Sequence, residues 1–333
     1  MTATSHDLLC LGNAIVDVLT RVDDDFLAAH AIVKGGMNLI DEARAETLYG
    51  AMGQTTIMSG GSAANTAVGA ANLRVRAAFI GKVRNDEVGG FFAHDLRAMG
   101  VHFATPTAGE GPATALSYIL VTPDGQRTMN TYLGACQNLT VGDVDEALVR
   151  ASGIVYLEGY LWDPPGAKEA FRKASEIAHA AGRKVALSLS DSFCVGRYRD
   201  EFLDLIRSRK VDVVFSNESE LLALYETADF GAALAALRAD CSLAAVTRGA
   251  DGAVVVEPSG LRAVSAFPIE NLVDSTGAGD LFASGFLAGL ARGRDAADCA
   301  RLGTLAAAEI IGHVGARPLA DLATLATREG LAA

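Results

Sequence analysis

The sequence predicts an α/β protein with one doubly wound, mostly parallel sheet, helices on both faces and a small β lid. Short apolar runs of strand length alternate with helix-length segments through most of the 333 residues, as repeated βα units require. Between residues 115 and 133 the pattern changes to two strand-like runs around Asp124-Gly125, which is typical of a hairpin. There is no repeat or linker, so we predict one domain over residues 1–333, with lid segments at about 18–40 and 115–133.

The N-terminal part of the chain predicts a buried strand, a flap and a helix rich in small residues. Residues 7–12 are an apolar run that ends in glycine, which indicates a buried strand leading into a loop. Residues 18–40 alternate weakly and predict strands of the flap. Small residues dominate 59–73, where a helix begins near Ser62. A strand at 77–80 and a helix that ends near residue 99 follow.

The remaining elements repeat the strand–helix pattern and end in helices. The predicted strand and helix pairs are 154–157 with 164–181, 184–189 with 199–208, and 211–215 with 217–225. Two further strands are expected at 243–247 and 253–256, and three helices at 277–292, 296–311 and 319–327.

Composition excludes several classes of protein. The formal net charge of −12 argues against non-specific binding to nucleic acid. Five scattered cysteines without Cys-x-x-Cys spacing predict neither a disulfide framework nor a zinc site, and they favour a reducing compartment. The N-terminus lacks a basic segment before its apolar run, and no run reaches the ~18 apolar residues of a membrane span. We therefore expect a cytoplasmic protein that acts on a small molecule and binds no membrane.

The stretch from Val273 to Phe286 carries the strongest chemical signal. It joins a turn of small residues, Thr276-Gly277-Ala278-Gly279, to an apolar run that predicts a helix. Free N–H groups and the positive end of the helix dipole at such a terminus bind an anion without a cationic side chain. Asp280 lies in the first turn, where it either caps the helix or takes a proton from an attacking hydroxyl. An anion cradle beside a base is what phosphorylation of a hydroxyl requires.

Polar residues and paired glycines in the N-terminal part are candidate ligand contacts. Asn13 and Asp17 follow the first strand, where open α/β sheets bind ligands, although turn residues are the commoner explanation of this spacing. Gly60-Gly61-Ser62 precedes Asn65 by one helical turn. Ser62 as a cap on a tightly packed helix explains this pattern too, but two glycines before the cap favour a ligand loop.

Three segments that follow predicted strands in the second half of the chain are also candidate ligand-binding sites. The acids of Asn217-Glu218-Ser219-Glu220 either complement a helix dipole or hold Mg²⁺ through water. Thr247-Arg248-Gly249-Ala250-Asp251-Gly252 is either a β-turn or a cradle for phosphates. Tyr160 and Trp162 precede a proline-stiffened loop, where aromatic residues are either core filling or a ligand surface. A P-loop, protein-kinase motifs and histidines at metal-ligand spacing are absent from the sequence.

In this order the motifs resemble those of the phosphofructokinase-B family of carbohydrate and nucleoside kinases, over nearly the whole chain. Asp274-Ser275-Thr276-Gly277-Ala278-Gly279-Asp280 is similar to the family's second signature, with Ser275 in place of threonine, and residues 60–65 are similar to the first. Residues 80–89 are similar to a neighbouring element that usually has glycine where Arg84 stands. The resemblance implies a ribokinase-like fold and an ATP-dependent kinase that uses Mg²⁺.

The resemblance also implies a role for each motif residue. Asp280 falls on the catalytic base, and Gly277, Ala278 and Gly279 fall on the anion hole, while Arg127 stands where a lid arginine reaches the transferring phosphate. The positions that bind the substrate are Asn13, Asp17, Gly60, Gly61, Ser62 and Asn65. Those that place Mg²⁺ and ATP are Asn217, Glu220, Thr247, Gly249 and Gly252. Family members often hold a monovalent cation, usually potassium, near Asp274, Thr276 and residues 308–315.

Within the family the chain is most similar to adenosine kinases, at residues 131–135, 188–193 and 314–318. We therefore expect phosphorylation of the 5′-hydroxyl of a purine nucleoside, with adenosine converted to AMP. Tyr132, Tyr160 and Trp162 would wall the slot for the base, although Trp162 is equally well explained as a core residue. A ribokinase or fructokinase is the alternative. A non-catalytic sugar or nucleotide sensor is disfavoured because it needs no base at the anion site, and a homodimer is compatible with the sequence.

Overall fold

The computed structural model describes residues 4–331, and its larger sheet has nine strands. Their order is β14-β13-β12-β11-β10-β9-β1-β5-β6, parallel from β12 to β6, with β13 and β14 antiparallel. The strands are β1 (His6–Leu11), β5 (Ala77–Ile80), β6 (His102–Phe103), β9 (Ser152–Glu158), β10 (Lys184–Ser188), β11 (Val213–Asn217), β12 (Leu243–Thr247), β13 (Ala253–Glu257) and β14 (Gly260–Val264). The predicted mostly parallel sheet is confirmed.

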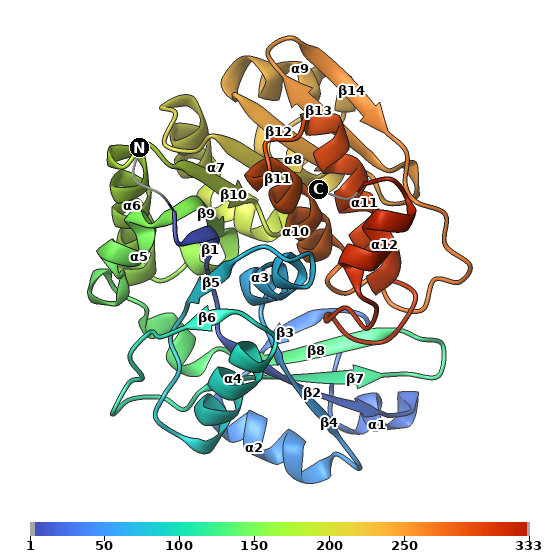
Figure 1. The fold of residues 1–333 in the computed structure, drawn as a ribbon. Coiled ribbons are helices and arrows are strands. Elements are labelled where there is room, and N and C mark those ends of the chain that lie inside the picture. Colours follow the sequence, from blue (N-terminus) through green and yellow to red (C-terminus); the bar gives the residue numbers. More distant parts are fainter. Residues whose placement is uncertain (1–3, 332–333) are drawn as a thin grey trace.

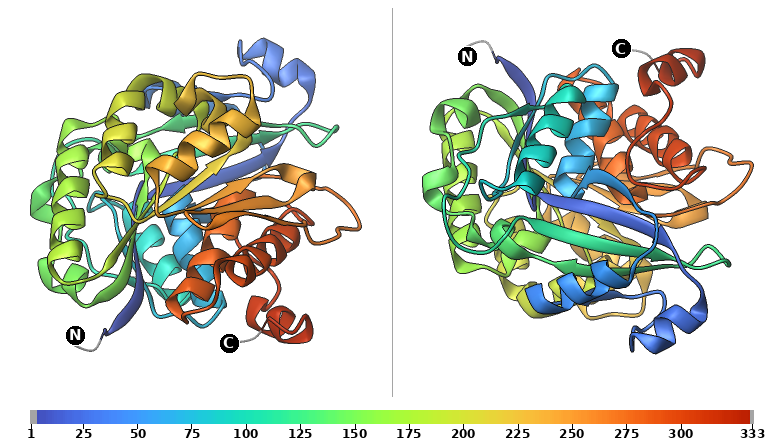
Figure 2. Two further views of the ribbon diagram at one scale, coloured as in Figure 1. Left: turned by 90° about the horizontal axis from the view of Figure 1, so that it is seen from above. Right: turned by 90° about the horizontal axis from the view of Figure 1, so that it is seen from below.

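Helices cover both faces of this sheet, as the views from above and below show (Figure 2). Both faces of the central strands are thereby buried, which is why these strands read as continuous apolar runs. One layer consists of α3 (Ser62–Asn72), α4 (Glu87–Ala98), α10 (Ala278–Ala291), α11 (Ala296–Ile310) and α12 (Leu322–Arg328). The other consists of α5 (Glu146–Arg150), α6 (Pro165–Ala180), α7 (Ser192–Arg207), α8 (Glu218–Tyr225) and α9 (Phe230–Asp240). No helix among residues 4–331 is long and apolar enough to cross a membrane.

A second sheet of five strands lies below the first (Figure 1). Its order is β3-β8-β7-β2-β4, and the predicted hairpin turns at Asp124-Gly125. The elements are β2 (Ile15–Arg21), α1 (Asp24–Ala29), β3 (Met37–Leu39), α2 (Glu42–Ala51), β4 (Thr56–Gly60), β7 (Ala115–Val121) and β8 (Arg127–Tyr132). We call these elements the lid sheet and its helices. Helices α1 and α2 pack on one face of the lid sheet, so alternation along the strands turns Asp17 and Ser117 to the opposite face.

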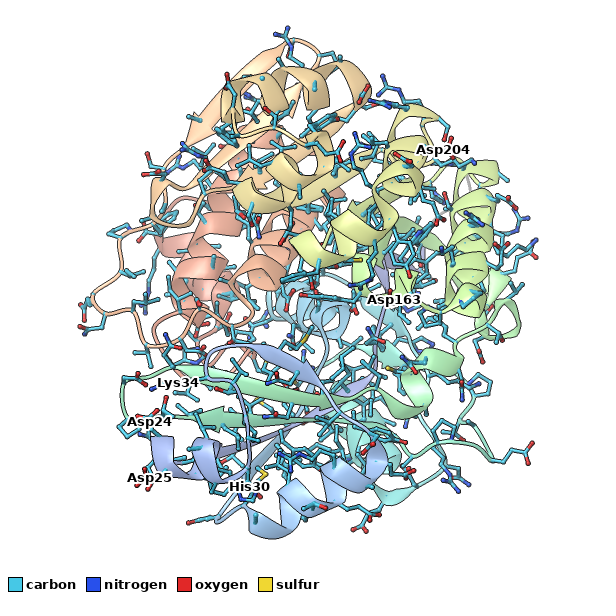
Figure 3. All side chains as sticks on the ribbon, turned by 180° about the vertical axis from the view of Figure 1, so that it is seen from behind. Asp24, Asp25, His30, Lys34, Asp163 and Asp204 are labelled. Atoms are coloured by element: carbon cyan, nitrogen blue, oxygen red, sulfur yellow. The ribbon has the colours of Figure 1, made fainter. Side chains whose placement is uncertain are left out.

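The lid sheet takes in more of the chain than residues 18–40 and 115–133, because α2 and β4 also belong to it. The apolar periodicity of α2 in the sequence is weak, because only Ala45 and Leu48 of this helix are buried. An ion-pair bridge fastens the hairpin turn to α1: Lys34 Nζ lies 2.7 Å from both Asp24 Oδ1 and Asp124 Oδ2. Lys34 and Asp24 are labelled in Figure 3.

Candidate active site

The turn before α10 forms an uncapped helix N-terminus. Gly277 has φ +78° and ψ −2°, a left-handed conformation, and a Cβ there would lie 2.8 Å from the Cβ of Ala316. No side chain caps the helix, and the N–H of Ala278 donates to Ser275 O at 3.2 Å. Among residues 4–331 we find no acceptor for the N–H groups of Gly277 and Gly279. These two of the three expected anion-hole residues therefore have N–H groups free to bind an anion.

Asp280 lies in the first turn of α10 and faces α3. Its carboxylate accepts hydrogen bonds from Ser62 Oγ at 2.6 Å and from Asn65 Nδ2 at 2.8 Å. Burial raises the pKa of Asp280 to about 6, while those two hydrogen bonds and the charge of Arg317 oppose the rise. The carboxylate is therefore ionised at neutral pH and is a stronger base than an exposed aspartate, which suits it to accept a proton.

Asn65 has an amide oxygen available to a ligand. The residue is only 5 % exposed, and its Oδ1 has no hydrogen-bond partner among the residues that the structure describes. Its Nδ2 is held by Asp280, so the oxygen faces away from that carboxylate. Leaving a buried acceptor unpaired costs about 1–3 kcal/mol, so a hydroxyl group of a ligand would gain a hydrogen bond here.

Gly60 and Gly61 bring the backbone against two other candidate residues. A Cβ on Gly60 would lie 2.3 Å from Asp17 Oδ2, and a Cβ on Gly61, with φ +94°, would lie 2.1 Å from Asn13 O. Only glycine permits this close approach. Burial raises the pKa of Asp17 to about 7, opposed by the charges of Arg317 and Arg127. Asn13, Asp17, Ser62, Asn65 and Asp280 are thus gathered around one turn.

Glu158, a residue that the sequence analysis missed, holds Asn13 and the start of α3 in place. It ends β9, is fully buried, and accepts from Asn13 Nδ2 at 2.7 Å and from Ala63 N at 2.8 Å. Burial raises its pKa to about 7, against the effect of those hydrogen bonds. An acid directly after the apolar run 154–157 was the available signal, since polar residues at the carboxyl ends of strands are candidate ligand contacts.

Arg127 contacts Asp274 rather than Asp280. Its Nη2 lies 2.7 Å from Asp274 Oδ2, and both side chains are over nine-tenths buried. This is a contact of charges without good hydrogen-bond alignment, because the same nitrogen has no partner that meets hydrogen-bond geometry. The Asp274 oxygens accept well-formed bonds from Thr276 N at 3.0 Å and Gly315 N at 3.1 Å. Arg127 thus joins the lid sheet to the loop before the anion hole.

The expected nucleotide residues lie at neighbouring strand ends. Asn217 and Thr247 are paired in register at the carboxyl ends of β11 and β12. Asn217 and Glu220 form a capping box on α8, with Asn217 Oδ1 accepting from Glu220 N at 2.9 Å and Glu220 Oε2 accepting from Asn217 N at 3.0 Å. Gly249 and Gly252 have φ +57° and +81° in the following turn. The capping explanation of the Asn217 motif therefore holds in this structure.

Magnesium fits this site only through water. Within residues 4–331 no three His, Cys, Asp or Glu side chains gather closely enough to hold a metal ion alone. Both oxygens of Glu220 already accept hydrogen bonds from Asn217, and burial raises the pKa of Glu220 to about 7. Mg²⁺ commonly keeps several waters and binds through few carboxylates plus substrate phosphates, which is compatible with this arrangement.

Two of the three aromatic residues expected at a base slot lie in hydrophobic cores instead. Trp162 is 1 % exposed and packs beside Phe171 and Phe202, with ring centroids 6.3 and 5.6 Å away. Tyr132 is 9 % exposed and belongs to the core under α2, on the helix-covered face of the lid sheet. The short helix at 159–162 turns Trp162 inward, and strand alternation turns Tyr132 outward from the site. These two side chains cannot stack on a ligand in this arrangement.

The third aromatic and an overlooked one lie nearer the strand ends. Tyr160 is partly buried and its hydroxyl donates to Ser190 O at 3.2 Å. Phe193, at the start of α7 just beyond the carboxyl end of β10, is 79 % exposed. A large exposed aromatic side chain near the carboxyl ends of the strands is a candidate stacking surface. The stretch 188–193 carried this signal in the sequence, but the exposure of Phe193 was not readable from it.

A cavity of about 470 Å³ adjoins the anion-hole loop. Its walls include Phe267, Ile269 and Leu305, with Glu270 and Glu309 among its polar residues. The N–H groups of Val273 and Asp274 donate to Ile311 O, which connects this cavity to the loop before Gly277. Polar residues, which also include Asn271 and Glu329, line this cavity about as much as apolar ones, so it is of mixed character.

The chain is similar to known kinases in sequence and fold. Residues 32–322 match the model of the pfkB family carbohydrate kinases. The structure of adenosine kinase from Sinorhizobium meliloti is 55 % identical with TM-score 0.92, covering 97 % of this chain and 99 % of that one. A probable sugar kinase from Rhizobium etli is 52 % identical with TM-score 0.94, covering 98 % and 99 %.

A curated relative extends the comparison to another substrate. The ATP-dependent ribose-1-phosphate kinase of Halopiger xanaduensis is 31 % identical over 300 residues, which are 86 % of this chain and 94 % of that protein. The match to the family model spans most of the chain and includes the glycine loop and the anion-hole turn. The chain therefore belongs to the pfkB family of carbohydrate kinases and is an ATP-dependent kinase.

Proposed function

We propose that this kinase transfers the γ-phosphoryl group of ATP to the 5′-hydroxyl of adenosine and forms AMP. The observation that carries the proposal is the half-buried Asp280 carboxylate in an uncapped helix turn, beside the unpaired amide oxygen of Asn65. The turn offers N–H donors to phosphate oxygens, and Asp280 offers a base for the attacking hydroxyl. Asn65 and Asp17 offer acceptors for other hydroxyl groups of a sugar ring.

In the proposed step the 5′-oxygen bonds to the γ-phosphorus while the bond from that phosphorus to the bridging oxygen of ADP breaks. The hydroxyl proton passes to Asp280. The N–H groups of Gly277 and Gly279 donate to the phosphoryl oxygens, and Arg127 adds positive charge from the lid side. Mg²⁺, when bound, neutralises phosphate charge, and Asn217 and Glu220 would hold it through water.

We place the nucleotide along the adjoining strand ends. The turn from Thr247 to Gly252 would receive phosphates through the N–H groups of Gly249 and Ala250, for which no acceptor is found among residues 4–331, whereas the N–H of Gly252 donates to Gly249 O at 3.1 Å. The cavity between residues 267–271 and α11 would receive the base of ATP, since it is partly apolar and connects to the anion-hole loop. A potassium ion near Asp274 and Thr276 is less well supported, because Asp274 already accepts two N–H groups and pairs with Arg127.

Adenosine is preferred here because an adenosine kinase is 55 % identical over nearly the full length. The exposed ring of Phe193 supports a base slot on this chain. A sugar kinase is the second candidate, and a specific observation favours it: Trp162 and Tyr132 are buried in cores, so a base would find fewer aromatic walls than expected. The similarity to the probable sugar kinase supports the same alternative.

The test is ATP consumption with adenosine, guanosine, inosine, ribose, fructose and fructose 6-phosphate, each with and without potassium. Adenosine should be the best acceptor. Phe193→Ala should raise KM for adenosine roughly 5- to 150-fold, because stacking on an aromatic ring is worth about 1–3 kcal/mol, and it should leave KM for ATP unchanged. A preference for a free sugar over every nucleoside would contradict the nucleoside assignment and leave the kinase assignment intact.

A further inference from the structure

Arg317 is a buried cation that makes no ion pair. It is 5 % exposed, and its three hydrogen bonds go to neutral oxygens: Nε to Ser59 O at 2.9 Å, Nη2 to Ser59 Oγ at 2.9 Å, and Nη1 to Ala64 O at 2.8 Å. Within residues 4–331 no carboxylate lies within ion-pair distance of it. Burying a charge without a paired carboxylate costs several kcal/mol, so stability alone does not account for this residue.

The guanidinium holds both ends of the glycine loop. Ser59 is the residue before Gly60 at the end of β4, and Ala64 lies in the first turn of α3. The backbone N–H of Ser59 is also fixed, by Asp95 Oδ2 at 3.0 Å. Between these anchors the loop carries the Gly60 contact with Asp17 and the Ser62 hydrogen bond to Asp280. The position of both carboxylates relative to each other thus depends on how the loop is held.

The positive charge of Arg317 also acts on both carboxylates. The negative charges that act on it come from Asp17, Asp95 and Asp280, and its own positive charge opposes the rise in the pKa of Asp17 and Asp280. A direct salt bridge would occupy carboxylate oxygens. An arginine that bonds to neutral oxygens instead supplies the charge and takes up no lone pair of Asp17 or Asp280, so Asp280 keeps its bonds to Ser62 and Asn65 and still has lone pairs for a hydroxyl group.

The two residues before Arg317 contact the other half of the site. Gly315 N donates to Asp274 Oδ2 at 3.1 Å, and Ala316 lies against Gly277, where a Cβ on the glycine would be 2.8 Å from that of Ala316. Three consecutive residues therefore contact the loop before the anion hole, the anion-hole turn and the glycine loop. The segment 315–317 therefore contacts both the phosphate side and the acceptor side of the candidate site.

We infer that Arg317 is a positioning residue for the phosphoryl acceptor. It holds the loop from Ser59 to Ala64 by hydrogen bonds, and its positive charge stabilises the ionised carboxylates of Asp17 and Asp280 without a direct bond to their oxygens. The inference rests on the proposed function in that the glycine loop receives the acceptor and Asp280 receives its proton. Loss of the hydrogen bonds from Arg317 should weaken acceptor binding and turnover, while the nucleotide site stays intact.

The experiment compares Arg317→Met and Arg317→Lys with wild type, using whichever acceptor of the panel wild type phosphorylates best. Arg317→Met should raise KM for the acceptor at least 10-fold and lower kcat at least 10-fold, with KM for ATP within about threefold of wild type, since hydrogen bonds to charged groups are worth about 1.5–3 kcal/mol. Arg317→Lys keeps the charge but cannot reach Ser59 and Ala64 together, so kcat should recover more than the acceptor KM. Arg301→Met, an exposed arginine on α11, is the matched control.

Several outcomes would overturn the inference. An unchanged acceptor KM in folded Arg317→Met would remove the positioning role, and equal increases in both KM values would indicate general damage. Equal kcat values for the lysine and methionine variants would remove the role of charge. Ser59→Ala, which removes only the Oγ acceptor, covers the case in which the methionine variant fails to fold, and a severalfold rise in acceptor KM alone is expected from it. If wild type prefers a sugar, the adenosine proposal fails, yet the comparison of Arg317 variants proceeds with that sugar.

Discussion

At the scale of single residues, Asp280 shows how burial and hydrogen bonding oppose each other in one carboxylate. Burial disfavours the charge, whereas Ser62, Asn65 and the nearby Arg317 favour it. Without the hydrogen bonds the pKa would be higher, so a larger fraction of the carboxyl would carry a proton at neutral pH and could not accept another. Without the burial it would be as weak a base as an exposed aspartate. The environment therefore sets a base strength suited to a hydroxyl that loses its proton as it attacks.

The first prediction concerns Asp280→Asn. Asparagine keeps the size of the side chain but cannot take a proton, so kcat should fall about 10²- to 10⁴-fold or more, which is the usual contribution of a general base. Binding of both substrates, measured by calorimetry, should persist. The melting temperature should change little, because removal of a charge from a half-buried site offsets the loss of one of the two hydrogen bonds from Ser62 and Asn65. Glu176→Gln on the exposed side of α6 is the control, and near-normal turnover in Asp280→Asn would refute the assignment.

The second prediction concerns pH. Burial raises the pKa of Asp280 to about 6 and that of Asp17 to about 7, and both exceed the ordinary value for aspartate. Each group gains its proton as pH falls through its own pKa, so a base is lost on the acid side. The plot of kcat/KM against pH should therefore be flat above about pH 8 and should fall as the pH is lowered from about 8 to 5. Full activity down to pH 5 would mean that neither carboxylate needs to be ionised.

Glu158 and Arg317, which sequence reasoning missed as site residues, share one property: their partners are far away in the chain. Glu158 bonds to Ala63 and Asn13, which are 95 and 145 residues away, and Arg317 bonds to Ser59 and Ala64 at separations of 258 and 253. A motif records neighbours in sequence, so it identifies Asp280 and the glycines around it. It contains no information about a charge brought in by a distant segment.

At the scale of elements, the loop between β4 and α3 is where the lid sheet meets the larger sheet. Gly61 adopts φ +94°, a conformation that side chains other than glycine rarely take, and its backbone touches Asn13. The sequence identified this loop from its paired glycines but did not predict β4, a strand of five residues. It also missed α2, because a helix with two buried residues gives almost no apolar periodicity.

The third prediction is that Gly61→Ala harms both stability and acceptor binding. The added Cβ would lie 2.1 Å from Asn13 O, a backbone atom that cannot move aside easily, and the backbone strain itself costs about 1–3 kcal/mol. Denaturant unfolding should show a loss of at least that size, and KM for the acceptor should rise more than KM for ATP. Gly50→Ala in α2 is the control, because nothing lies within 4 Å of its added Cβ and alanine favours helix by about 0.5–1 kcal/mol.

At the scale of the whole molecule, the fold was largely predictable and the acceptor was not. Buried parallel strands such as β1 and β9 must be apolar on both faces, so their runs were visible in the sequence. The family match shows a kinase, which removes the hypothesis of a non-catalytic sensor. Whether Trp162 lines a slot or fills a core depends on how α6 and α7 pack around it, and local sequence does not encode that packing.

The last prediction concerns closure of the lid sheet over the larger sheet. Phosphoryl transfer to a hydroxyl competes with transfer to water, so the acceptor should draw the two sheets together. In the structure they are joined by the pair of Arg127 and Asp274 and by the clamp of Arg317 on Ser59, both buried. Adenosine should therefore slow amide hydrogen exchange in β2, β7 and β8, while β9 and β10 in the larger sheet serve as internal controls. Exchange in the lid strands that is the same with and without acceptor would show that the sheets are held together before it binds.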